Sequence, residues 1–238
     1  MADRTTAARD LQDLLLLHTP PVALAFLPTP PAGVPHVDAA GPSGCTYWKY
    51  AAEGRTFYTE AADHYNCPVG AYTHGVELPP EQAQQLQGVL GTMFGLGYLR
   101  PEEIPTIPRR PGAFAVAVYA PLAEAPFEPD VVLVCGNARQ VMLLAEAAQA
   151  AGVGDGTGLM GRPTCAAVPE ALQTGHAVAS LGCIGNRVYT GLGDDELYFA
   201  LPGQHLAALA EKLATIVEAN RELEKYHRAK RAAAAASR

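Results

Sequence analysis

Apolar residues recur along the chain with two different spacings, which predict an alternation of helices and strands. Three- and four-residue spacing predicts helices over residues 4–17, 80–92, 138–151 and 204–230. Short apolar runs bounded by proline or glycine predict strands over 22–27, 113–120, 131–134 and 196–201. Shorter helices are expected at 46–53 and 169–173, and shorter strands at 56–59 and 177–180. This alternation predicts an α/β fold, a mixed sheet with flanking helices, and an α+β fold is the alternative.

Similar features follow one another in the same order in the two halves of the chain. The segment Leu201-Pro202-Gly203-Gln204 repeats Leu78-Pro79-Pro80-Glu81, and two leucines follow each segment at the same offsets. An apolar strand precedes each set of features. This order predicts one domain, residues 1–238, built from two related, pseudo-symmetric units of about 20–95 and 130–225. Residues 226–238 are expected to form a frayed tail, and chance matching is the alternative to duplication.

The composition narrows the class of protein. The 238 residues are 49% hydrophobic, which excludes an intrinsically disordered chain. The net charge of −7 argues against nucleic acid as a partner. No apolar run reaches the ~20 residues that span a bilayer, and residues 1–10 lack the features of a signal peptide. We therefore expect a cytoplasmic protein without a membrane partner, in which the five cysteines are free thiols, metal ligands or reactive groups.

Four of the cysteines fall two to each predicted unit: Cys45 and Cys67 in the first, Cys165 and Cys183 in the second. Four thiolates can hold an iron–sulfur cluster or a zinc ion. The leading hypothesis is therefore a protein that binds a metal or an iron–sulfur cluster where the two units meet. No C-x-x-C pair is present, so the fold itself must bring the four together. Burial of the cysteines as small apolar side chains is the alternative.

A second hypothesis rests on the residues around Cys67. Asp63, His64 and Cys67 place an acid, an imidazole and a thiol within five residues. A thiol-dependent enzyme would use Cys67 as the nucleophile, His64 as the base and Asp63 to orient the base. Arg187 would then bind an anionic group of a small substrate. Alternatively, Asp63 and His64 cap a turn and Arg187 lies in a surface turn, and whether the protein is an enzyme stays open.

A third hypothesis is a non-catalytic protein that binds a small molecule in a pocket between the units. Cys135 ends a predicted strand and Asn137 opens the next helix, a junction where α/β proteins often bind ligands. Asn186, beside Arg187, is a further ligand-binding candidate. The alternative for Cys135 is a buried residue at the end of its strand. The expected partner is a small molecule or a metal, and a homo-oligomer stays open.

Three segments together resemble a known family. They are Cys45-Thr46-Tyr47-Trp48-Lys49, Asp63-His64-Tyr65-Asn66-Cys67-Pro68-Val69-Gly70, and Ser180-Leu181-Gly182-Cys183-Ile184-Gly185-Asn186-Arg187-Val188-Tyr189-Thr190-Gly191. They resemble the domain-of-unknown-function 169 family of bacteria and archaea, and the resemblance extends over about residues 20–215. It implies a single unit rather than a fusion, and it implies no particular activity.

Overall fold

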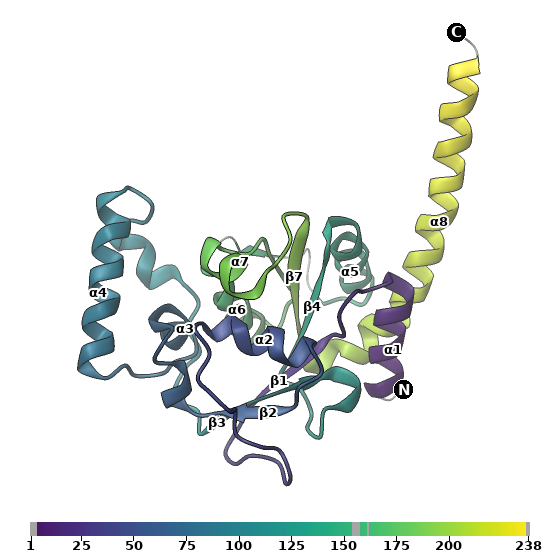
Figure 1. Ribbon diagram of the computed structural model, residues 1–238. Coiled ribbons are helices and arrows are strands. Elements are labelled where there is room, and N and C mark those ends of the chain that lie inside the picture. The colour runs from purple at the N-terminus through teal and green to yellow at the C-terminus, as the bar shows by residue number, and fades with distance from the viewer. Residues whose placement is uncertain (1–3, 154–157, 161, 237–238) are drawn as a thin grey trace.

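A twisted sheet forms the centre of the computed structural model, which describes residues 4–153, 158–160 and 162–236 (Figure 1). The sheet has seven strands in the order β2-β3-β1-β4-β7-β6-β5. The strands are β1 (Val22–Leu27), β2 (Phe57–Thr59), β3 (Val116–Pro121), β4 (Val131–Asn137), β5 (Gly158–Met160), β6 (Val178–Ser180) and β7 (Glu196–Pro202). Neighbouring strands are antiparallel, except that β5 and β6 are parallel. The predicted mixed sheet with flanking helices is confirmed.

Three strands on each side of the sheet have the same order and the same register, and the edge strand β5 beyond β6 has no counterpart. Outward from the central β1–β4 pair, the order is β1, β3, β2 on one side and β4, β7, β6 on the other. Val22 of β1 lies opposite Pro121 of β3, as Val131 of β4 lies opposite Pro202 of β7. Because β1 and β4 are antiparallel at Ala23, one side maps onto the other by a two-fold rotation there. The fold therefore has two pseudo-symmetric halves.

The strand pairing makes Pro121 the counterpart of Pro202, whereas the sequence comparison matches Pro202 with Pro79. Pro121 and Pro202 each end a strand, and each is followed by a short 3-10 helix. Pro79 instead leads into a helix at the periphery. The register therefore argues that the first half of the fold extends to Pro121. The predicted unit boundaries, 20–95 and 130–225, stay a prediction.

Helices cover both faces of the sheet (Figure 1). They are α1 (Arg4–Leu15), α2 (Gly44–Ala52), α3 (Pro68–Thr73), α4 (Pro80–Gly95), α5 (Ala138–Ala150), α6 (Ala167–Thr174), α7 (Ile184–Thr190) and α8 (Leu206–Ala236), with 3-10 helices η1 (Ala61–His64), η2 (Pro101–Thr106), η3 (Leu122–Glu124), η4 (Thr164–Ala166) and η5 (Gly203–His205). Side chains alternate along each strand. Ala23 and Ala25 face a core with α1, α5 and α8, while Val22 and Leu24 face a core with α2, α3 and α6. The second core carries the candidate site.

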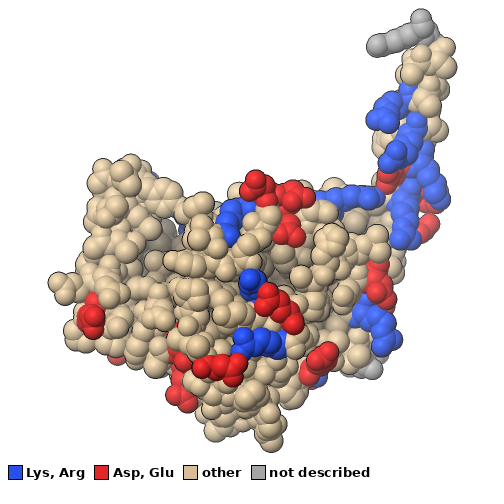
Figure 2. Space-filling model, viewed as in Figure 1, with Lys and Arg blue, Asp and Glu red and all other residues tan. Residues whose placement is uncertain are grey.

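Two helices differ from the sequence expectation. The apolar spacing that predicts the helix at 80–92 also predicts a buried face of Leu86, Val89, Leu90 and Met93, but α4 has no buried residue, and Val89 is 43% exposed. Periodicity marks an apolar face and does not reveal whether the fold supplies a partner for it. In Figure 2 the region of α4 is nearly free of charge.

Of the tail expected to fray, residues 226–236 are instead helical, since α8 continues to Ala236, and residues 237 and 238 lie outside the described residues. The alanines at 232–236 favour helix strongly, and this accounts for the difference. Among the described residues, no helix is long and apolar enough to cross a membrane.

Candidate functional site: four cysteines beside the sheet

Each of four short elements places one cysteine at or near its first turn. Cys45 lies in the first turn of α2, and Cys165 lies in η4, which leads into α6. Cys67 and Cys183 immediately precede α3 and α7. Pro68 favours the start of α3 because its fixed φ suits a helix and its missing N–H needs no partner there. We call Cys45, Cys67, Cys165 and Cys183 the four-thiol cluster.

The four thiols lie close enough together for their charges to interact. The charges of the other three thiols raise the pKa of Cys45, in addition to the larger effect of burial. Those of Cys67 and Cys183 raise the pKa of Cys165, again after burial, and Cys183 does the same to Cys67. Every pairing of the four is represented. The fold therefore brings together residues that lie far apart in the sequence.

Backbone groups surround the Cys67 sulfur closely. Hydrogen bonds from the backbone of Gly44 and Gly70 lower the pKa of Cys67, against the larger opposing effect of burial. A Cβ at position 70 would lie 2.8 Å from Cys67 Sγ and 3.7 Å from the Gly44 Cα. The two glycines thus allow α2 and α3 to meet at the sulfur, and their N–H groups favour a thiolate there.

Polar side chains connect the thiols to the surrounding fold. Thr164 Oγ1 accepts a hydrogen bond from the Cys183 N–H at 2.5 Å, which ties η4 to the start of α7. Thr73 lowers the pKa of Cys165 by hydrogen bonding. Asn186 is 2% exposed, and its side-chain amide has no hydrogen-bond partner of ordinary geometry among the described residues, yet it lies near enough to lower the pKa of Cys45. These contacts fix the elements that carry the thiols.

The four thiols do not form a preformed site for a single metal ion. In the described ranges, no three or more His, Cys, Asp or Glu side chains are grouped so that they could hold a metal ion. A tetrahedral zinc site with Zn–S bonds of about 2.3 Å holds its sulfurs roughly 3.8 Å apart. The thiols interact through their charges without reaching that arrangement.

The predicted relay from Asp63 through His64 to Cys67 is not formed. Asp63 Oδ2 instead accepts hydrogen bonds from His36 Nε2 and from the Glu60 N–H, each at 2.7 Å. It therefore caps a turn, which is the structural alternative. His64 Nε2 contacts Thr59 Oγ1 at 2.9 Å, so its ring is positioned by the sheet rather than by the acid.

A buried histidine pair lies next to this region. The rings of His64 and His74 are 5.7 Å apart, and both are essentially inaccessible. Burial lowers the pKa of His64 to about 3, with the charge of His74 as a smaller cause. Burial also lowers the pKa of His74 to about 4, so both rings are neutral at pH 7. Neither carries the positive charge that would activate a thiol.

Arg187 does not offer its guanidinium to a ligand. Its nitrogens donate to the carbonyl oxygens of Gly193 at 2.6 Å, Leu181 at 2.5 Å and Glu196 at 3.4 Å. The side chain thereby joins the segment before α7 to the turn before β7. The expectation of an anion-binding arginine is replaced by a structural role.

Asn137 also differs from its predicted role. Asn137 Oδ1 accepts from the Gln140 N–H at 3.0 Å, and the Asn137 N–H donates to Gln140 Oε1 at 2.7 Å. This reciprocal cap occupies the start of α5 where an anion was expected. Cys135 lies in β4, and burial followed by the charge of Glu196 raises its pKa to about 12.

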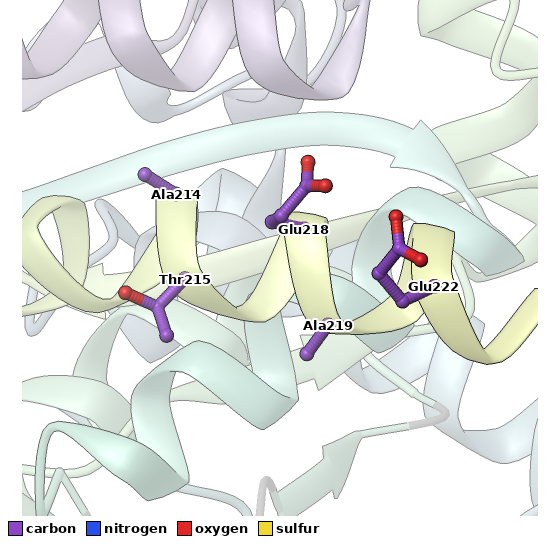
Figure 3. Close-up of a pocket in the computed structure, with 5 residues that line it drawn as sticks. All are labelled: Ala214, Thr215, Glu218, Ala219 and Glu222. Carbon is purple, nitrogen blue, oxygen red and sulfur yellow. The ribbon is translucent and has the colours of Figure 1, made fainter.

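A shallow depression of about 540 Å³ lies elsewhere, along α8 (Figure 3). Its lining residues are Ala214, Thr215, Glu218, Ala219 and Glu222, all from that one helix. Because no second element contributes a polar group, the depression lacks the convergence of a ligand site.

Several residues around the four-thiol cluster were not singled out in the sequence, notably Gly44, Gly70, Thr73, His74 and Thr164. A signal was present: Cys67 precedes Gly75 by eight residues, and Cys183 precedes Gly191 by eight. Both glycines have positive φ near the end of a short helix. The repeated spacing marks two equivalent cysteine–helix–glycine units.

Comparison with known proteins places the chain in a family. The family model DUF169, described as "Uncharacterised ArCR", matches residues 10–212, so the chain belongs to this family. The chain is also 30% identical over 227 residues to the uncharacterized protein MJ0308 of Methanocaldococcus jannaschii. The match covers 89% of this chain and 91% of that protein. No solved structure matches the chain.

Proposed function

We propose that the protein binds an iron–sulfur cluster through Cys45, Cys67, Cys165 and Cys183. The observation that carries this proposal is the mutual electrostatic contact of four thiols contributed by both halves of the fold. Thiolates are the usual ligands of such clusters. When bound, the cluster would supply one-electron transfer.

The donor set is the reason for proposing a cluster. Four cysteines are the usual ligand set of an iron–sulfur cluster, and in each pair of the four the charge of one thiol raises the pKa of the other. The backbone hydrogen bonds to Cys67 also suit a cluster, since N–H groups near the sulfurs stabilise their negative charge.

The raised pKa values of two of the thiols would couple metal binding to the release of protons. Burial and the neighbouring thiols raise the pKa of Cys45 and Cys165, so these two are protonated at neutral pH in the metal-free protein. Iron would replace these protons and turn mutual repulsion of the thiolates into attraction to a shared cation. Binding should therefore release protons and weaken as the pH falls.

The thiol-enzyme hypothesis is the weaker candidate. A nucleophilic cysteine needs a lowered pKa and an adjacent base. Burial raises the pKa of Cys67 instead, and His64 is held by Thr59 as a neutral ring. The hydrogen bond between the two residues joins backbone groups, from the Cys67 N–H to the His64 carbonyl oxygen at 3.0 Å, and does not involve the thiol or the ring.

Serine variants test the proposal. Each of Cys45→Ser, Cys67→Ser, Cys165→Ser and Cys183→Ser should lower the iron and acid-labile sulfide that copurify anaerobically. Cys135→Ser is the matched control, because this thiol is the one outside the cluster. Equal iron loss in the control and the cluster variants would contradict the assignment, as would zinc in place of iron and sulfide.

A further inference from the structure

A cavity of about 180 Å³ opens between α2 and the ends of β4 and β7. The residues that define its chemistry are Trp48, Lys49, Glu53, Cys135, Glu196 and Tyr198. Val22 and Leu133, which face each other across the central strand pair, form part of its floor. The cavity therefore lies where the two halves of the sheet meet.

Two aromatic rings form one wall. Trp48 and Tyr198 make an edge-on contact with ring centroids 5.3 Å apart, and both are more than nine-tenths buried. Their faces and edges are fixed by packing in the core around α2. Such a wall accommodates hydrocarbon and favours a positive charge beside a ring.

The charged side chains that line the cavity, those of Lys49, Glu53 and Glu196, sum to one negative charge. Arg187, outside the lining, donates to the backbone carbonyl oxygen of Glu196 at 3.4 Å. Lys49 pairs with Glu53 at 3.5 Å, which leaves the Glu196 carboxylate without a cationic partner among the described residues that line the cavity. One Glu196 oxygen accepts the Gly193 N–H at 2.7 Å, so the carboxylate is held in place. Asp194 and Asp195 precede it and add to the negative field. Figure 2 shows acidic side chains where α7 leads into β7.

Cys135 adds no second charge to the cavity. Burial and the charge of Glu196 keep its thiol protonated at neutral pH. An anionic ligand would meet Glu196 and Glu53, while a purely apolar ligand would cover the Glu196 carboxylate without compensating it. A ligand with one positive charge and a short hydrocarbon chain would pair with the Glu196 carboxylate and pack against the rings of Trp48 and Tyr198.

We propose that this cavity binds a small organic cation, a protonated primary amine of a few carbons. Its ammonium group would lie at Glu196 and its hydrocarbon against Trp48 and Tyr198. The site does not depend on the proposed cluster, but the two are adjacent. Asn186 and the charge of Cys45 both act on the pKa of Tyr198, so Tyr198 faces the cavity and lies near the cluster.

The chain provides its own reporter for this binding, because Trp48 is its single tryptophan. We expect n-butylammonium chloride to change the tryptophan fluorescence of the purified full-length protein in a saturable way at pH 7. Sodium n-butyrate and n-butanol, which share the hydrocarbon, should bind at least about tenfold more weakly.

Two variants with opposite expected effects keep the test independent of folding. Glu196→Gln should weaken n-butylammonium binding about tenfold, whereas Lys49→Gln should strengthen it by freeing Glu53. Glu218→Gln, on α8, is the matched control that leaves binding unchanged. A fold defect cannot produce the gain expected of Lys49→Gln.

Cys45→Ser distinguishes the amine-binding proposal from the iron–sulfur proposal. Cys45→Ser should lose iron and still bind n-butylammonium, since Cys45 does not line the cavity. Saturable butyrate binding of equal strength would overturn the assigned charge. The absence of any fluorescence change with n-butylammonium, or an unchanged affinity in both Glu196→Gln and Lys49→Gln, would overturn the site.

Discussion

Cys67 and Gly70 are in such close contact that a Cβ added at position 70 would lie 2.8 Å from the Cys67 sulfur. The contact occurs where α2 and α3 meet, and the same glycine gives a backbone hydrogen bond to that sulfur. Any larger residue at 70 must move the thiol or the helix. The position of Cys67 relative to the other thiols thus depends on a residue with no side chain.

We therefore expect Gly70→Ala to destabilise the protein by about 1–3 kcal/mol, the usual cost of overpacking a close contact. It should also lower the amount of iron bound, because the Cys67 thiol is displaced. Denaturant unfolding and iron analysis measure the two effects. Gly88→Ala is the control: nothing lies within 4 Å of its added Cβ, and it should stabilise α4 by about 0.5–1 kcal/mol. A neutral Gly70→Ala would show that the contact is not tight.

Replacing Arg187 tests its structural role. Arg187→Ala removes the hydrogen bonds to the Leu181 and Gly193 carbonyl oxygens, and should destabilise the protein by roughly 1.5–3 kcal/mol. Arg187→Lys should be destabilising as well, since an ammonium cannot span both carbonyls as the guanidinium fork does. Chemical denaturation of both variants checks this. If Arg187→Ala and Arg187→Lys were both as stable as the unmodified protein, the structural role would be contradicted and the ligand-binding hypothesis for Arg187 would be favoured.

The buried histidine pair predicts a loss of stability at mildly acidic pH. The native pKa values of His64 and His74 are lowered from 6.5 to about 3 and about 4, so the unfolded chain takes up protons first as the pH falls. The contribution of the two neutral histidines to the free energy of unfolding is complete above pH 6.5. Below that pH it decreases by about 1.4 kcal/mol per pH unit for each histidine.

The free energy of unfolding between pH 6.5 and 4.5 measures this effect. His74→Gln should make the decline shallower by about 1.4 kcal/mol per pH unit. His227→Gln, on the exposed part of α8, provides the control. Identical slopes for His74→Gln and the unmodified protein would show that His74 is not buried as a neutral ring.

The thiols of the metal-free protein should react in a definite order. Cys45 and Cys165 are buried with raised pKa values, whereas Cys67 and Cys183 are partly exposed. Iodoacetamide at pH 7 should therefore label Cys67 and Cys183 first, and slowly, because burial raises the pKa of Cys67. Mass spectrometry of timed samples resolves the order. Rapid, selective labelling of Cys67 would instead favour the thiol-enzyme hypothesis.

Local patterns predicted most of the elements, because each depends on nearby residues. The strand expected at 22–27 is observed as Val22–Leu27, and the helix expected at 138–151 is observed as Ala138–Ala150. The helix α7 was missed, since Gly185 and Asn186 are poor helix formers and tertiary contacts hold the segment. Arg187 supplies some of these contacts by joining its two flanking segments.

The site was less accessible from sequence than the fold. The grouping of Cys45 with Cys165 depends on the pairing of β1 with β4, which no local spacing encodes. The roles of Asp63 and Arg187 depend on which carbonyl, amide or ring lies within reach in the folded chain. Only the repeated placement of two cysteines per half pointed to a shared site, and it did so without any C-x-x-C signature.

The most direct test of the central claim is iron and acid-labile sulfide analysis of the full-length protein, purified without oxygen and without added metal. The account predicts iron and sulfide in equal amounts, lost together when the cluster thiols are replaced and retained in Cys135→Ser. Protein that contains neither, and that takes up neither after anaerobic reconstitution with ferrous iron and sulfide, would contradict it.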